Sequence, residues 1–132
     1  MSFPLLQKFQ KNYGWPIVSN GDHYNISYIP HHDTKPQYTK PVFYWHPAIS
    51  PSGFIFYNGS VFKDWNGSAL LGSFNSEALV ILKIADNKVS SEERIWLHRR
   101  IRDIIQVADG SVMIITDYKD GELIRLSPTG NP

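Results

Sequence analysis

The sequence contains no cysteine and carries almost no net charge. With no cysteine among its 132 residues, the chain has no disulfide framework, no thiolate metal site and no cysteine nucleophile. The formal charge of +1 removes the basic surplus that nonspecific binding to nucleic acid or to anionic membranes requires. We therefore expect neither nucleic acid nor membrane among its partners.

Long apolar runs are missing as well. No run approaches the roughly eighteen residues of a membrane-spanning helix. The first ten residues, MSFPLLQKFQ, lack a charged stretch followed by a long apolar one, so we expect no signal peptide and assign no compartment. Their pattern predicts at most one short helical turn.

What the sequence does have is aromatic residues and turn formers. Aromatic residues make up 14% of the chain, which favours β structure. Residues 11–41 are rich in Tyr, Asn, Gly, His and Pro without periodicity, which predicts an ordered surface loop segment. Beyond them, short apolar segments alternate with turns such as Asn58-Gly59, Asp86-Asn87 and Asp109-Gly110. About seven segments are expected to be strands: GFIFYNG, SALLGSF, EALVILKIA, SEERIWLH, RIRDIIQVADG, SVMIITDYKDG and ELIRLSP.

These segments predict an all-β fold, an antiparallel meander with a weak internal repeat. Two groups of strands recur at an offset of about fifty residues, the spacing of β-propeller blades. Two blades do not close a ring, so the alternatives are a sandwich or a piece of something larger. We expect one domain, residues 1–132, with a loop-rich segment (1–40), a first blade-like unit (41–99) and a second, partial one (100–128).

The segment LHRRIRDII, Leu97 to Ile105, gathers cations at the start of an apolar strand. In a strand Arg100 and Arg102 point to one face, and Ile101 and Asp103 to the other. Two guanidinium groups at that spacing suit a small polyanion. From the residues alone, an exposed strand end with ordinary surface ion pairs is favoured. Its pairs would join Arg99, Arg100 or Arg102 to Glu92, Glu93 or Asp103.

Other candidate motifs are weak. His31, His32 and Asp33, with His23, invite a metal site, but adjacent histidines point in opposite directions and no spaced carboxylate set accompanies them. A solvated loop is the favoured interpretation. Three glycosylation-type triplets begin at Asn25, Asn58 and Asn66, and the last two are better explained as turns. No phosphate loop, nucleophile elbow or catalytic triad is present, so we predict no catalytic residue.

Four ordered motifs resemble a known family. They are KNYGWP (Lys11–Pro16), PVFYWHPAISPSGFIFYNG (Pro41–Gly59), WNGSALLGSF (Trp65–Phe74) and RIRDIIQVADGSVMIITD (Arg100–Asp117). Together they are similar to the C-terminal part of the soluble sugar dehydrogenases that depend on pyrroloquinoline quinone (PQQ), the aldose, glucose and sorbosone dehydrogenases. The resemblance runs from Lys11 to Pro128 and is specific for the family, not for a substrate.

The resemblance implies a six-bladed β-propeller with PQQ in its central channel, a bridging calcium ion and a histidine base that takes the sugar hydroxyl proton before hydride passes to the quinone. The family's Arg-x-Arg pair, which contacts PQQ, corresponds to Arg100 and Arg102. Its members are typically periplasmic or secreted. A further segment lines the family's cofactor pocket: Phe43, Trp45, His46, Pro47 and Ala48.

Departures from the family pattern limit this expectation. Asn75 stands where some members have a lysine near PQQ, and His46 where many have an acidic residue. The segments that carry the base and the calcium ligands precede KNYGWP in the family, so we expect no metal site in this chain. The predicted cofactor contacts are Arg100, Arg102, Asn75, Trp45 and His46.

Three functions remain open at this point. The favoured one is a truncated or degenerate relative that keeps at most part of a PQQ or anion subsite and is not catalytic alone. The alternative is a PQQ- and calcium-dependent aldose sugar dehydrogenase completed by oligomerisation or a partner chain. A lesser alternative is a propeller-like interaction module. Because partial propellers leave strand edges exposed, we also expect a homo-oligomer.

Overall fold

A computed structural model describes residues 11–21 and 27–129 of the chain. The helical turn predicted for residues 1–10, His23 and the triplet at Asn25 lie outside the described residues. The chain forms two compact units, Met1–Ile49 and Ser50–Pro132. In the described ranges, no helix is long and apolar enough to cross a membrane.

The described part of the first unit consists of loops with one short 3-10 helix, η1 (His32–Thr34). A turn at Gly14 starts it, since the amides of Ile17 and Val18 both donate to the Gly14 carbonyl at 2.7 and 3.0 Å. Gly14 has a φ of +87°, which favours glycine. Between residues 11 and 41, the described residues thus form turns, bends and loops with one 3-10 helix.

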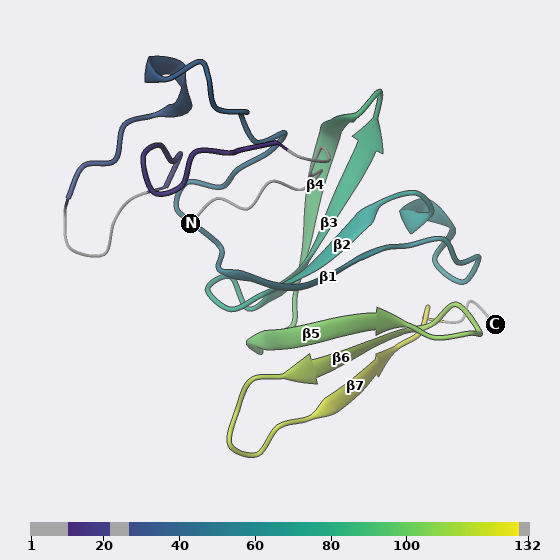
Figure 1. Cartoon of the computed structure of the whole chain (residues 1–132). Coiled ribbons are helices and arrows are strands. Elements are labelled where there is room, and N and C mark those ends of the chain that lie inside the picture. Colours follow the sequence, from purple (N-terminus) through teal and green to yellow (C-terminus); the bar gives the residue numbers. More distant parts are fainter. Residues whose placement is uncertain (1–10, 22–26, 130–132) are drawn as a thin grey trace. The chain divides into compact units, whose positions relative to one another are not determined.

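The second unit holds seven strands (Figure 1). A four-stranded antiparallel sheet has the order β1-β2-β3-β4, and a three-stranded one has the order β5-β6-β7. The predicted antiparallel meander of seven strands is confirmed. The strands are β1 (Pro51–Phe56), β2 (Ala69–Ser73), β3 (Ala78–Ala85), β4 (Lys88–Trp96), β5 (Ile101–Gln106), β6 (Val112–Thr116) and β7 (Leu123–Leu126).

The core of this unit is built from both sheets. Strands β2 and β3 are buried on both faces over most of their length, which explains why they read as continuous apolar runs. Strand β5 contributes Ile101 and Ile104, which are 0% and 2% exposed. They join one cluster in which the first sheet contributes Leu70, Leu79 and Ile81, the β1–β2 connection Tyr57 and Trp65, and β6 Val112 and Ile114. This shared cluster anchors β5 against the first sheet. Burial of each large apolar side chain contributes about 1.5–3 kcal/mol.

Turn predictions succeed where the turn is local. Asp86 and Asn87 link β3 to β4 with φ of 50° and 59°, as a two-residue hairpin turn of type I′ requires. The tight hairpin predicted at Asn58-Gly59 is wrong, because β1 and β2 are joined by a longer connection that contains the 3-10 helix η2 (Lys63–Trp65). The buried Tyr57 ring holds this connection, with Phe62 and Trp65 packed edge-on at 6.0 and 6.2 Å.

Candidate functional site

The two predicted arginines meet on one aromatic ring. The guanidinium carbons of Arg100 and Arg102 lie 4.9 and 5.7 Å from the centroid of the Phe74 ring. Phe74 follows β2 and is half-buried, while both arginines are exposed at the start of β5. The two guanidinium groups therefore lie on the same face, as strand alternation predicts. Each such contact contributes about 0.5–1 kcal/mol at an exposed site, enough to orient the side chain.

A β-bulge separates this pair from the rest of β5. Ile101 pairs with Thr116 but Asp103 pairs with Ile115, so Arg102 is an extra residue in the ladder. The prediction that Asp103 shares the face of Ile101 is wrong. Because the bulge shifts the alternation by one, Ile104 is buried beside Ile101, and Asp103 is exposed. The bulge thus aims Arg102 outward without interrupting the buried face.

The ion pairs around these arginines differ from the predicted ones. Arg100 Nη2 donates to Asp117 Oδ2 at 3.0 Å, and its side chain is 48% exposed. Arg99 Nε donates to Glu122 at 2.9 Å, and this hydrogen bond raises the pKa of Arg99 above its usual value. None of the described carboxylates pairs with Arg102. At this strand end Arg99 and Arg100 form exposed ion pairs, whereas the Arg102 guanidinium faces solvent without a partner among the described carboxylates.

Of the other predicted contacts, Asn75 lies next to this cluster. It follows Phe74 in the connection between β2 and β3 and is exposed. Trp45 and His46 belong to the first unit, where Trp45 is 8% exposed and packs edge-to-face on Phe43 at 5.0 Å, while His46 is exposed. The structure thus brings together Arg100, Arg102 and the connection that carries Asn75.

The histidine loop has a structural role. His32 is 4% exposed, and its Nε2 lies 2.9 Å from the Tyr13 carbonyl oxygen. Its Nδ1 lies 3.0 Å from the side-chain oxygen of Asn20. Both ring nitrogens are thus engaged in holding loops of the first unit together, which leaves neither for a metal ion. The solvated-loop interpretation is wrong for His32, because its ring is buried and both ring nitrogens contact protein oxygens instead of solvent.

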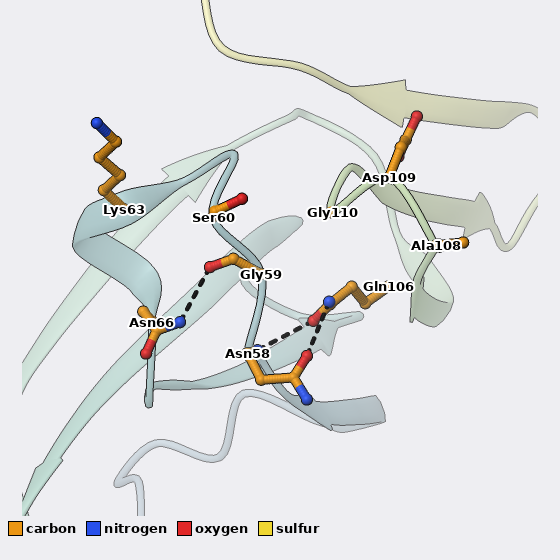
Figure 2. Close-up of a pocket in the computed structure, with 9 residues that line it drawn as sticks. All are labelled: Asn58, Gly59, Ser60, Lys63, Asn66, Gln106, Ala108, Asp109 and Gly110. Atoms are coloured by element: carbon orange, nitrogen blue, oxygen red, sulfur yellow. Dashed lines mark hydrogen bonds between the residues drawn. The ribbon is translucent and has the colours of Figure 1, made fainter.

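A second candidate is an open hollow of about 470 Å³ between the β1–β2 connection and the β5–β6 turn (Figure 2). It lies beyond the far end of β5 from Arg102. The Gln106 amide donates to Asn58 Oδ1 at 2.8 Å and accepts from the Asn58 backbone amide at 3.0 Å. Asp109 at its edge accepts from Ser111, which lowers the pKa of Asp109, and pairs with Arg125. Among the residues that line this hollow, Lys63 is the one cation and Asp109 the one carboxylate, so the hollow does not concentrate positive charge for a polyanion.

Comparison with known proteins identifies the family of this chain. The family described as Glucose / Sorbosone dehydrogenase matches residues 6–125 of the chain. The chain belongs to this family. The uncharacterized protein slr1608 of Synechocystis is 36% identical over an alignment of 124 residues, and the match covers 92% of this chain and 30% of that protein. The aldose sugar dehydrogenase YliI of Escherichia coli is 34% identical over an alignment of 124 residues, and the match covers 89% of this chain and 33% of that protein.

Solved structures of this family share the fold. A crystal structure of glucose dehydrogenase matches with a TM-score of 0.82 and 32% identity, over 90% of this chain and 36% of that one. The PQQ-bound aldose sugar dehydrogenase of Streptomyces coelicolor matches with a TM-score of 0.58 and 18% identity, over 89% and 33%, which shows a common fold alone. The predicted fold, equivalent to about two blades of a six-bladed propeller, is confirmed. The chain spans about a third of the length of these relatives.

Sequence reasoning missed Phe74, the residue that gathers the family's arginine pair. Phe74 ends the family motif Trp65–Phe74 and directly precedes Asn75, but no local pattern indicates its contact with the arginines. It also missed Tyr118, whose hydroxyl accepts from the Arg100 amide at 3.2 Å and lies 3.4 Å from Glu77. These contacts connect the start of β5 to two different turns. They position the backbone of Arg100, the first residue of the motif Arg100–Asp117.

Proposed function

We propose that the Arg100–Arg102 pair is a subsite for the carboxylates of PQQ, and that this chain does not oxidise sugar by itself. The observation that carries the proposal is the pair of guanidinium groups on the Phe74 ring, of which only Arg100 has a partner among the described carboxylates. The planar donor fork of Arg102 is thus available for a bidentate carboxylate contact. Arg100 and Arg102 therefore fit the negatively charged carboxylates of PQQ.

Relatives support the choice of ligand. The Streptomyces coelicolor protein is described as PQQ-bound, and the Escherichia coli relative as an aldose sugar dehydrogenase. PQQ would supply the two-electron acceptor, and this chain's own contribution is to bind and orient its carboxylates through Arg100 and Arg102. We expect Asn75, which is exposed on the neighbouring connection, to add a neutral hydrogen bond where a lysine is found in some members.

A second candidate function is a sugar dehydrogenase that is completed by further protein. The observation that favours it is coverage, since the chain matches about a third of each active relative's length. Within residues 11–21 and 27–129, no group of three or more His, Asp or Glu side chains is arranged to hold a metal ion. In this alternative the calcium ligands and the histidine base come from another copy or a partner chain.

Replacing Arg102 with alanine is expected to weaken PQQ binding about ten- to a hundredfold, because a hydrogen bond to a charged group contributes about 1.5–3 kcal/mol. Replacing Arg100 is expected to cost less, because Asp117 already offsets part of its charge. Isothermal titration calorimetry of the purified chain with PQQ measures both.

The matched control is Arg99→Ala, which removes the same charge from the same segment but from a side chain paired with Glu122. It should bind PQQ within about twofold of the unaltered chain, whereas a PQQ triester, which lacks the carboxylate charges, should bind to none of them. Equal affinity of Arg102→Ala and Arg99→Ala for PQQ would contradict the subsite.

A dye-reduction assay with aldoses, PQQ and calcium tests the proposal that the chain does not oxidise sugar by itself. Turnover by the purified chain alone would show that it is a complete enzyme.

A further inference from the structure

Three asparagines in the chain are directly followed by glycine. The pairs all lie in turns, bends or loops of the described residues, and they are Asn20-Gly21, Asn58-Gly59 and Asn66-Gly67. An Asn-Gly pair is where a side chain reacts most readily with the chain's own backbone, because glycine has no Cβ to shield its nitrogen and adopts many backbone conformations. The three pairs share this chemistry, so differences in their reactivity come mainly from the fold.

The reaction is a loss of ammonia followed by an addition of water. The glycine backbone nitrogen gives up its proton to solvent and attacks Cγ of the asparagine side chain, which forms a succinimide ring. The bond from Cγ to Nδ2 breaks, and Nδ2 leaves as ammonia. Water then opens the ring at either of its carbonyls and yields aspartate or isoaspartate. No reagent besides water is needed, so the freedom of the glycine N–H to lose its proton and reach Cγ decides where the reaction occurs.

The fold occupies both reacting groups of the Asn66-Gly67 pair. The Gly67 amide donates to the carbonyl oxygen of Tyr57, a fully buried residue, at 2.8 Å. The Asn66 side-chain amide donates to the Gly59 carbonyl at 3.0 Å. Before this pair can react, the bond to Tyr57 has to open and the Asn66 side chain has to turn away from Gly59. These bonds therefore protect Asn66, although its side chain is exposed.

A different set of contacts holds the Asn20-Gly21 pair. The Gly21 amide donates to the hydroxyl oxygen of Ser19 at 3.1 Å. The side-chain oxygen of Asn20 lies 3.0 Å from Nδ1 of His32, which is buried. The glycine nitrogen is thus engaged by one partner, and the side chain that it would attack is held by another. Asn20 is therefore protected as well.

The Asn58-Gly59 pair lacks this protection. The Asn58 side chain is exposed, and the Gly59 amide donates to none of the residues in the described ranges. The side-chain amide of Gln106 donates to Asn58 Oδ1 at 2.8 Å (Figure 2). That oxygen gains negative charge when Cγ is attacked, and a donor aimed at it stabilises the charge. The Gly59 nitrogen therefore neighbours a side-chain carbonyl that is already polarised for attack.

We infer that Asn58 is a modification site, which the folded chain converts to aspartate or isoaspartate through attack by the Gly59 nitrogen, while the other two asparagines are preserved. The reaction is independent of PQQ. It adds a carboxylate to the hollow in Figure 2, where Asp109 is the one carboxylate among the lining residues before the change. Isoaspartate also lengthens the backbone between positions 58 and 59 by a methylene group. Deamidation therefore changes both the charge and the shape of this hollow.

Peptide mapping of the unaltered chain tests this site. The folded protein is incubated in mildly alkaline buffer and digested with chymotrypsin, which separates the three pairs because it cuts after aromatic residues. Mass spectrometry then measures the conversion of amide to acid in each peptide. We expect Asn58 to be converted about two- to tenfold faster than Asn20 or Asn66, since each of those pairs must first break a hydrogen bond. In urea, where these bonds are lost, the three rates should converge.

A substitution at Ser19 tests the cause directly. Ser19→Ala removes the hydroxyl that accepts from the Gly21 amide, so the Asn20 conversion rate should rise about two- to tenfold. The Asn58 rate should stay within about twofold, because its own contact with Gln106 is unchanged. The matched control is Ser90→Ala, which removes an exposed hydroxyl that donates to the Lys83 carbonyl and should leave all three rates unchanged.

Three results would overturn the inference. One is an equal conversion rate at the three asparagines of the folded chain. Another is a preference for Asn58 that persists undiminished in urea, because it would then come from the flanking sequence and not from the fold. The third is an unchanged Asn20 rate in Ser19→Ala, because the hydrogen bond of the glycine amide would then not decide which asparagine reacts.

Discussion

Replacing Gly72 with alanine should lower the free energy of unfolding by about 1–3 kcal/mol, the usual cost of overpacking a well-packed core. Gly72 lies in β2, and a Cβ there would stand 2.5 Å from Ile101 Cγ2 and 2.6 Å from Ser52 Oγ. Ser52 has little freedom to yield, because its hydroxyl donates to the Ile101 carbonyl at 2.5 Å. A glycine-to-alanine change elsewhere gains about 0.4–1 kcal/mol from the unfolded chain, so the clash outweighs that gain.

Urea denaturation of the two proteins measures this difference. The matched control is Gly121→Ala, where the nearest atoms, the carbonyl oxygens of Thr116 and Tyr118, lie 3.4 Å from the added Cβ. That contact is ordinary, so the control should unfold within about 0.5 kcal/mol of the unaltered chain. If Gly72→Ala were as stable as Gly121→Ala, close packing of β2 on Ile101 would be refuted. Because Ile101 lies between Arg100 and Arg102, the same substitution should also weaken PQQ binding.

The sequence predicts the strands well because their signals are local. Strand β3 is a continuous apolar run closed by Asp86-Asn87, and both the run and the turn depend on neighbouring residues only. The connection after β1 follows a different rule. There Asn58-Gly59 resembles a hairpin turn, but the buried Tyr57 ring and its bond to Gly110 decide the path. A contact between residues so far apart in the chain leaves no local pattern.

The features of the candidate site likewise separate into those that follow from local sequence and those that depend on strand pairing. The common face of Arg100 and Arg102 follows from alternation over three residues, which a sequence reveals. The bulge at Arg102 follows from how β5 pairs with β6, and the Phe74 contact from how β5 packs beside β2. The ion partners Asp117 and Glu122 likewise come from strands or turns brought near by that pairing. Contacts between side chains that strand pairing brings together therefore cannot be predicted from the sequence alone.

Replacing Tyr57 with phenylalanine should lower the free energy of unfolding by about 1–3 kcal/mol, although every ring contact is kept. The hydroxyl donates to the buried Gly110 carbonyl at 2.7 Å and accepts from the Phe62 amide at 3.1 Å. Its removal leaves the buried Gly110 carbonyl and the part-buried Phe62 amide without that partner, and an unmet buried group costs more than a net hydrogen bond contributes.

The matched control for this change is Tyr44→Phe, which removes the same atom from a ring that is 49% exposed and should change stability by less than about 0.5 kcal/mol. Urea denaturation of both variants separates the two cases, and equal stability would show that the Tyr57 hydroxyl does not hold the β1–β2 connection. Since the bond to Gly110 ties that connection to the β5–β6 turn, the Tyr57 variant should also show faster hydrogen exchange at the Gly110 amide, which donates to the Val107 carbonyl at 2.9 Å. The hydroxyl then acts as a tie between the two sheets, at the opposite end of β5 from the arginine pair.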